Sequence, residues 1–174
     1  MRTKTTTREL YTFSELSEEA KEAAVNNCRH YSTRNDWWEG PFEDAAKVGL
    51  KITSFDLDRN RYAEGEWMTS AKECAQSILG EHGETCETYK TAKAFLEERD
   101  LLIGAWATDE DGELEYGGKL DDELYDLEGE FLESIVEDYS IMLQNEYEYM
   151  YSDEAVEEAI QSNEYEFTED GEHA

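Results

Sequence analysis

Acidic residues are concentrated at one end of this chain. The last 68 residues, 107–174, contain 25 aspartates and glutamates and a single basic residue, Lys119, which gives a local charge of −24. The preceding 106 residues contain 20 acidic and 14 basic residues and account for the other −6 of the formal charge of −30. Like charges at this density oppose compaction, and a few net charges suffice for solubility. The uneven charge therefore predicts a surface that binds a positively charged partner.

The size of this charge is comparable to that of a DNA site. Duplex DNA carries one negative charge per ~1.7 Å of axis, so 24 charges correspond to roughly 41 Å, or about 12 base pairs. The same field repels nucleic acid, membrane surfaces and acidic ligands, and it speeds association with basic proteins. We therefore expect a partner protein with a basic nucleic-acid-binding groove, and neither direct nucleic-acid binding nor membrane binding.

Composition favours a folded chain over a disordered one. Hydrophobic residues make up 39% of the 174 residues and include 11 Tyr, 6 Phe and 4 Trp, which is more than a disordered acidic chain carries. One proline, no linker-like run and no repeat predict a single domain over 1–174, with basic residues almost confined to 1–106 and a strongly acidic region over 107–174. No apolar run of about 18 residues occurs, and the three cysteines are expected to be reduced. We expect a cytoplasmic protein.

Apolar residues recur at helical spacing in six segments. Thr12 and Glu15 have the spacing of a capping box, and Ser17 is a second start signal. Trp37 and Trp38 are expected in the core, because large aromatic side chains dominate cores. The predicted helices cover about 17–30, 35–49, 69–79, 84–99, 121–149 and 152–161.

Two hairpins and a final strand are predicted between and after these helices. Leu50–Leu57 and Tyr62–Met68 have strand-like composition on either side of a polar turn. Leu101–Thr108 and Glu113–Tyr116 flank an Asp-Gly pair, which is a strong hairpin signal. Tyr165–Phe167 is expected to form the last strand. The predicted fold class is α+β, with several helices packed with two short antiparallel hairpins and a long acidic C-terminal helix.

The long helix predicted over 121–149 separates apolar from acidic residues. Its apolar face consists of Leu124, Leu127, Phe131, Ile135 and Met142. On its other face, acidic residues follow at spacings of four, four, three and four: Asp122, Asp126, Glu130, Glu133 and Glu137. Four residues of helix span about 6 Å, comparable to successive phosphates of one DNA strand. Like charges at this spacing cost a few tenths of a kcal/mol per pair, so folding stability does not favour the row.

Residues beyond this row extend the predicted partner-binding surface. The acidic ones are Glu146, Glu148, Asp153, Glu154, Glu157 and Glu158. Tyr147, Tyr149 and Tyr151 are candidate anchors, because tyrosine is enriched among the residues that dominate binding energy at interfaces. Binding through such charges is expected to weaken as salt rises.

One segment resembles a calcium loop but lacks decisive residues. Asp56–Trp67 begins with the spacing D-x-D-x-N. Arg61 then stands where the turn needs glycine, and Trp67 stands where a bidentate glutamate is needed. We therefore predict no calcium site at this loop.

Zinc and catalytic motifs are equally incomplete. The candidate zinc ligands are Cys74, His82 and Cys86, with Cys28 or His30 as the fourth. No C-x-x-C pair is present and the spacing matches no common zinc site. No G-x-S-x-G, P-loop or H-E-x-x-H motif occurs. We predict no metal, no cofactor and no catalytic residue, and hence a protein that is not an enzyme.

Both ends of the chain resemble small acidic proteins carried by phages and prophages. The similar segments are Leu10–Lys21, Trp37–Trp38, Phe42–Ala45, Glu146–Tyr149, Ser152–Val156 and Asn163–Gly171. Over Arg61–Met68 many of these proteins have a Gly-Asp-Gly-rich turn, of which this chain keeps only Gly65. The family is mostly uncharacterised and some members are labelled as toxin-antitoxin components. The resemblance implies a phage accessory gene and assigns no catalytic residue.

These observations lead to one preferred function and three alternatives. The preferred function is a phage-encoded anti-defence inhibitor, foremost an anti-CRISPR, which mimics DNA in the basic groove of a defence enzyme in the cytoplasm of the infected bacterial host. The alternatives are an antitoxin or regulatory partner of one basic protein, a halophilic acidic protein of unrelated function, and a metal-dependent enzyme. Whether the chain forms a homodimer is left open.

Overall fold

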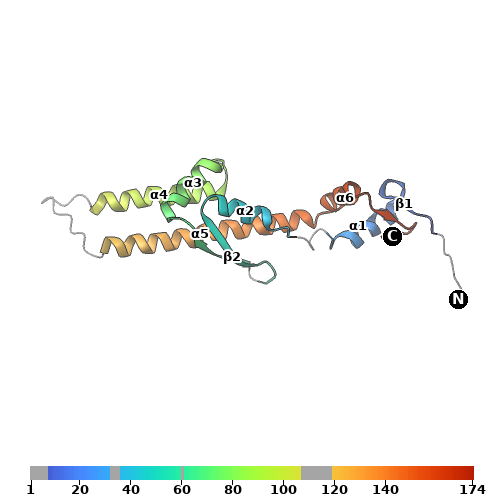
Figure 1. Cartoon of the computed structure of the whole chain (residues 1–174), viewed down its shortest axis with the longest axis horizontal. Coiled ribbons are helices and arrows are strands. Elements are labelled where there is room, and N and C mark those ends of the chain that lie inside the picture. Colours follow the sequence, from blue (N-terminus) through green and yellow to red (C-terminus); the bar gives the residue numbers. More distant parts are fainter. Residues whose placement is uncertain (1–7, 32–35, 60, 107–118) are drawn as a thin grey trace. The chain divides into compact units, whose positions relative to one another are not determined.

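The computed structural model describes residues 8–31, 36–59, 61–106 and 119–174 (Figure 1). The chain divides into two compact units. The terminal unit consists of residues 1–37 and 145–174, and the central unit consists of residues 38–144. Helix α5, Lys119–Met150, contributes residues to both. The single domain expected from chain length stays a prediction, because the compactness of each unit does not decide whether either folds alone.

The central unit combines four helices with a hairpin. Helices α2 (Glu39–Lys47), α3 (Ala71–Glu81) and α4 (Glu87–Trp106) join the larger part of α5, and strands β2 (Leu50–Asp56) and β3 (Tyr62–Trp67) pair antiparallel. The register places Leu50 opposite Trp67, with an irregularity between Ile52 and Ser54. This hairpin confirms the first of the two predicted from the sequence.

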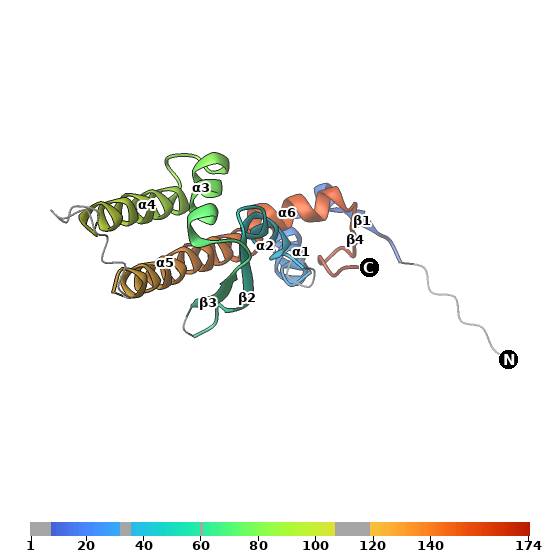
Figure 2. The ribbon, with the colours of Figure 1, turned by 60° about the vertical axis from the view of Figure 1, so that its left-hand side comes forward.

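The core of the central unit is built on one face of α5. Phe131 stacks on Phe95 of α4, with ring centroids 4.2 Å apart, and also on Trp67 of β3, at 5.3 Å. Ile135 and Tyr139 of α5 are fully buried in the same cluster. Helices α4 and α5 consequently lie side by side (Figures 1 and 2), with the hairpin packed against α5.

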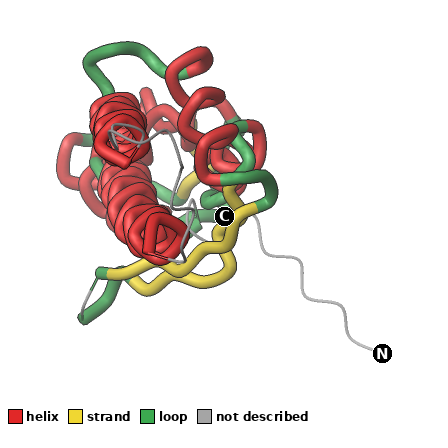
Figure 3. The backbone as a smooth tube through the Cα atoms, turned by 90° about the vertical axis from the view of Figure 1, so that its left-hand side faces the viewer, coloured by secondary structure: helices red, strands yellow, loops and turns green. Residues whose placement is uncertain are grey.

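The terminal unit brings together the two ends of the chain. Strand β1 (Tyr11–Thr12) pairs antiparallel with β4 (Glu166–Phe167), and Phe13 of the short 3-10 helix η1 (Phe13–Glu15) packs edge-on against Phe167. Helices α1 (Glu18–Cys28) and α6 (Asp153–Ser162) pack beside this sheet. Figure 3 colours the strands yellow and the helices red.

Helix starts in the terminal unit follow from capping residues. The Ser17 side chain accepts a hydrogen bond from the Ala20 amide, and Ser152 accepts one from Ala155, each at 3.2 Å. Thr12 and Glu15 form the predicted capping box at η1, and Ser17 is the N-cap of α1. These local signals explain why the predicted starts of the first and last helices are confirmed.

Two predicted elements differ from the structure. The helix expected over 35–49 begins only at Glu39, after Trp38 as its N-cap residue. The strand expected over 101–108 is wrong where it is described, because 101–106 continue α4. Apolar residues keep helical spacing into that stretch, and Leu102 packs against the central core. The rest of the second predicted hairpin, 107–118, lies outside the described residues.

The predicted α+β fold class is confirmed. The described residues form six α-helices and two small two-stranded antiparallel sheets, with the long α5 near the C-terminus. The second sheet pairs β1 with β4 instead of forming a hairpin. None of the described helices is both long enough and apolar enough to cross a membrane.

Candidate functional site

The predicted acidic residues of α5 lie together on one exposed side of the helix. Asp122, Asp126, Glu130, Glu133 and Glu137 are all exposed, and we call them the acidic row. At about 100° per residue, they fall within a sector of roughly 80°. Leu127, Phe131 and Ile135 on the other side of α5 are buried. The structure therefore confirms that the five residues of the predicted row are exposed along one side of α5, opposite its buried face.

One member of the acidic row is paired with a cation. Arg61, which directly precedes β3, forms an ion pair with Glu137 and donates hydrogen bonds to Ser140 Oγ and Gln144 Oε1, each at 3.0 Å. Asp122, Asp126, Glu130 and Glu133 form no ion pair with another residue in the described part of the chain. The first four carboxylates of the row thus keep their charge available to a partner.

Packing of the opposite face compensates for repulsion within the row. Burying one large apolar side chain contributes about 1.5–3 kcal/mol, whereas a like-charge pair three or four residues apart costs a few tenths. Phe131, Ile135 and Leu143 of α5 are each at most 3% exposed. Burial outweighs repulsion by a wide margin, so α5 carries the row although only Glu137 is paired with a basic residue in the described part of the chain.

Helix α4 adds a further carboxylate beside the row. Glu98 of α4 and Glu130 of α5 line a shallow groove whose apolar wall includes Phe95 and Leu127. Both glutamates are exposed. The negative surface therefore widens from α5 onto its neighbour.

An exposed tyrosine next to the row was not predicted as a site residue. Tyr125 is 77% exposed, the largest exposed fraction among the large hydrophobic side chains described. It lies beside Asp126 and three residues from Asp122, and so belongs to the same turn of α5. In the sequence, Tyr125 falls outside the helical spacing of the apolar face of α5, and this position is the signal that indicates an exposed side chain.

The second group of predicted acids belongs to the terminal unit, where all six are exposed. These are Glu146, Glu148, Asp153, Glu154, Glu157 and Glu158. Asp153 is 2.5 Å from Arg29, whose guanidinium also donates to the backbone oxygen of Tyr151. The structure thus groups the predicted acids into two sets, one in each unit.

The three predicted tyrosine anchors differ in exposure. Tyr149 is 52% exposed. The half-buried Tyr147 ring lies 5.5 Å from that of Trp37 and 4.9 Å from that of Tyr151, centroid to centroid. The Tyr151 hydroxyl is 2.8 Å from His30 Nδ1. Tyr147 and Tyr151 therefore contribute to packing within the terminal unit, and Tyr149 is the most accessible of the three.

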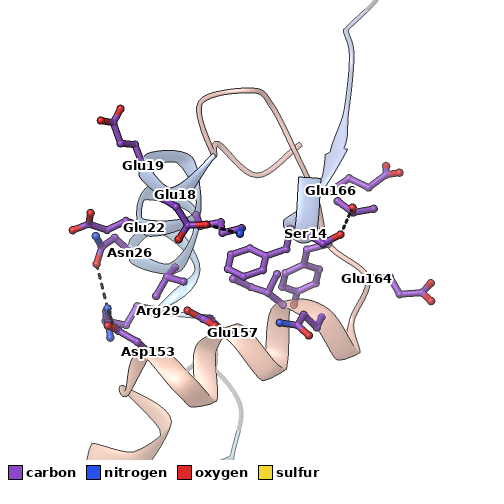
Figure 4. A pocket seen from close by; sticks show the side chains of 17 residues that line it. Ser14, Glu18, Glu19, Glu22, Asn26, Arg29, Asp153, Glu157, Glu164 and Glu166 are labelled. Atoms are coloured by element: carbon purple, nitrogen blue, oxygen red, sulfur yellow. Dashed lines mark hydrogen bonds and ion pairs between the residues drawn. The ribbon is translucent and has the colours of Figure 1, made fainter. Parts of the chain in front are cut away.

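The terminal unit also contains a groove that the sequence does not predict. It has a volume of about 1120 Å³ and lies between α1 and α6, which are more than a hundred residues apart in sequence. Figure 4 shows the carboxylates around it, with Glu18, Glu19 and Glu22 on α1, Asp153 and Glu157 on α6, and Glu164 and Glu166 beyond α6. We call it the α1–α6 groove.

One carboxyl group of α5, that of Asp138, has a raised pKa but does not belong to the acidic row. Asp138 is half-buried and accepts a hydrogen bond from the Thr91 hydroxyl at 2.7 Å. Burial raises the pKa of Asp138, the Thr91 hydrogen bond opposes this rise, and Glu87 and Glu137 add to it. Asp138 thus joins α5 to α4 and is not a charge presented to solvent.

The residues considered as zinc ligands have other surroundings. Cys74 is buried, and burial raises its pKa to about 11. His82 Nδ1 is 2.7 Å from the Thr88 hydroxyl, and His82 Nε2 is 3.3 Å from Asp44. Within the described ranges, no group of three or more His, Cys, Asp or Glu side chains is arranged to hold a metal ion.

Comparisons with protein-family models, with curated proteins and with solved structures find no match to this chain.

Proposed function

We propose that this protein is a DNA-mimicking inhibitor, which uses the acidic row of α5 to occupy the nucleic-acid-binding groove of a basic protein. The observation that carries the proposal is that four neighbouring carboxylates of the row are exposed and have no ion pair with a described residue. The resemblance to phage accessory proteins supports a host defence enzyme as the target class, for which we favour a CRISPR effector.

Charge spacing along the row is within a factor of two of that along one DNA strand. From Asp122 to Glu133 the helix rises roughly 17 Å over three intervals, so successive carboxylates lie about 5–6 Å apart along the axis. One strand of duplex DNA has one phosphate per ~3.4 Å of axis. A rigid helix holds this spacing before binding, which reduces the ordering cost of association.

Neighbouring side chains supply contacts that a charge row alone lacks. Glu98 widens the negative surface, and the exposed Tyr125 ring offers apolar area beside the row. Aromatic side chains surrounded by polar ones commonly dominate interface energies. We therefore assign Tyr125 as the anchor of the central unit, in addition to the predicted anchor Tyr149 of the terminal unit.

Competition for DNA is the direct test. A basic nucleic-acid-binding protein captured from DNase-treated bacterial lysate is identified, and displacement of fluorescent duplex DNA from it is measured. The triple variant Asp126→Lys, Glu130→Lys, Glu133→Lys is expected to lose displacement by at least about a hundredfold, as three reversed contacts cost several kcal/mol. Binding is also expected to weaken when salt rises from about 0.05 to 0.5 M.

A matched control distinguishes the effect of the acidic row on displacement from the effect of total charge. The variant Glu43→Lys, Glu81→Lys, Glu84→Lys changes three other exposed acids of the central unit by the same total charge. It is expected to retain displacement within about threefold once salt screens long-range attraction. Equal losses in both variants, or affinity that is independent of salt, would overturn the mimicry.

The same experiment distinguishes the antitoxin or regulatory alternative. If one cognate protein is neutralised by shape-specific burial, Tyr125→Ala is expected to weaken binding more than the triple charge reversal does. That result would replace DNA mimicry with a partner-specific apolar interface.

A further inference from the structure

The α1–α6 groove is a separate surface from the acidic row, because the described residues that line it all belong to the terminal unit. Its buried lining residues, Phe13, Val25 and Ile160, are apolar and form its base, and the half-buried Tyr165 also contributes to the lining. A hollow with an apolar base and polar walls suits a ligand that has one apolar and one polar side.

The walls of the groove are strongly negative. Seven carboxylates line it against two basic residues, Lys21 and Arg29. Both cations are already engaged inside the groove, Lys21 with Glu18 at 2.8 Å and Arg29 with Asp153 at 2.5 Å. The five other carboxylates form no ion pair with a described residue: Glu19, Glu22, Glu157, Glu164 and Glu166. Charge complementarity therefore calls for a ligand with several positive groups.

The size of the groove indicates how much of a partner it holds. A helix of about 10 Å diameter and 1.5 Å rise fills roughly 120 Å³ per residue, so 1120 Å³ corresponds to two to three helical turns. Such a segment is long enough to place Lys or Arg at positions i and i+4 toward both walls while its apolar side faces the base.

We propose that the α1–α6 groove binds an amphipathic, Lys/Arg-rich helical segment of a partner protein. The apolar side of this helix lies on Val25 and Ile160, and its cations meet the carboxylates of α1 and α6. The groove is thus a second docking surface, and its binding does not depend on the acidic row.

The test uses the full chain and a fluorescent peptide of about 14 residues, long enough to support a helix, with Lys and Arg on one face and Leu on the other. The variant Glu19→Gln, Glu22→Gln, Glu157→Gln is expected to weaken binding at least tenfold. The matched variant Glu9→Gln, Glu169→Gln, Glu172→Gln removes three exposed acids of the same unit that do not line the groove. It is expected to bind within about twofold of the parent at 0.15 M salt.

Two further arms make the outcome decisive. A peptide with Ser in place of Leu keeps its charge and is expected to lose most of the affinity, because the apolar base is left uncovered. The Asp126→Lys, Glu130→Lys, Glu133→Lys variant is expected to bind the peptide unchanged, which separates this proposal from the function of the acidic row. Circular dichroism of each variant confirms that the helices remain folded.

Three results would overturn the proposal. These are equal weakening by both glutamine variants, no preference for the Leu-containing peptide, and peptide binding that appears only after Arg2, Lys4 and Arg8 are replaced by alanine. The last result would mean that the basic N-terminal segment of this chain occupies the groove instead of a partner.

Discussion

The half-buried carboxyl of Asp138 shows how one residue can link stability to pH. Its pKa is raised mainly by burial, so the folded chain binds the proton of Asp138 more readily than the unfolded chain does. Stability from this group therefore increases as pH falls through the raised pKa toward the usual aspartate value, and it is lost again as pH rises.

Asp138→Asn is expected to stabilise the protein at neutral pH. Asparagine keeps an oxygen that accepts the hydrogen bond from Thr91, and it removes a partly desolvated charge near Glu87 and Glu137. The gain in free energy of unfolding is expected to be at most about 1 kcal/mol at pH 7, since partial exposure screens the charge. Urea unfolding at pH 7 and pH 4 measures it, and the gain should shrink at pH 4. A loss of stability at pH 7 would mean that the hydrogen bond to the charged carboxylate outweighs the burial.

The three cysteines are expected to react at very different rates. Cys86 is exposed, whereas Cys28 and Cys74 are buried and burial raises the pKa of both thiols. Thiolates are the reactive form, so a chromogenic disulfide reagent should rapidly label one thiol in the folded chain and three in denaturant. Cys86→Ser should abolish the rapid phase. Rapid labelling of all three thiols in the folded chain would contradict the buried positions of Cys28 and Cys74.

At the scale of elements, the acidic row places like charges side by side along α5. Glu130 is four residues from Asp126, three from Glu133, and shares a groove with Glu98. Glu130→Gln is therefore expected to raise the free energy of unfolding by about 0.5–1 kcal/mol at low salt, a few tenths per relieved pair. Chemical denaturation at low and high salt measures this gain, which should decline as salt rises.

The control for this prediction lies on α4. Glu97 is 4.0 Å from Lys93, four residues away, so Glu97→Gln removes an attraction instead of a repulsion. It is expected to lower stability by a few tenths of a kcal/mol at low salt. Stabilisation of the same size by both variants would show that total charge matters and the spacing of the row does not.

Local signals made most of the elements and the acidic row predictable. Ser17 and Ser152 fix helix starts through contacts three residues away, and the row follows from helical spacing alone. The α1–α6 groove was not predictable in this way, because it depends on Arg29 meeting Asp153 across more than a hundred residues. The helical end of α4 differs from the predicted strand because the Asp-Gly pair at 111–112 favours a hairpin, whereas the apolar spacing to Leu102 continues the helix.

At the scale of the whole molecule, apolar packing must outweigh the repulsion that comes with a net charge of −30. Two separate cores supply this packing, one around Phe131 and Tyr139 in the central unit and one around Phe13 and Phe167 in the terminal unit. Self-repulsion among exposed carboxylates opposes both cores, and salt screens it. Stability is consequently expected to depend on ionic strength more than in a protein of balanced charge.

The salt range in which this stabilisation occurs distinguishes screening from halophilic adaptation. Between about 0.01 and 0.15 M salt the Debye length falls from roughly 30 to 8 Å, so most of the relief from repulsion should come within this range. We expect the melting temperature to rise there by roughly 3–6 °C, equivalent to about 1–2 kcal/mol for a chain of this size, and then to level off. Thermal unfolding followed by circular dichroism in sodium chloride measures it. A halophilic protein would instead gain stability steadily into the molar range, and that result would remove the reason to interpret the acidic row as a surface selected for a partner.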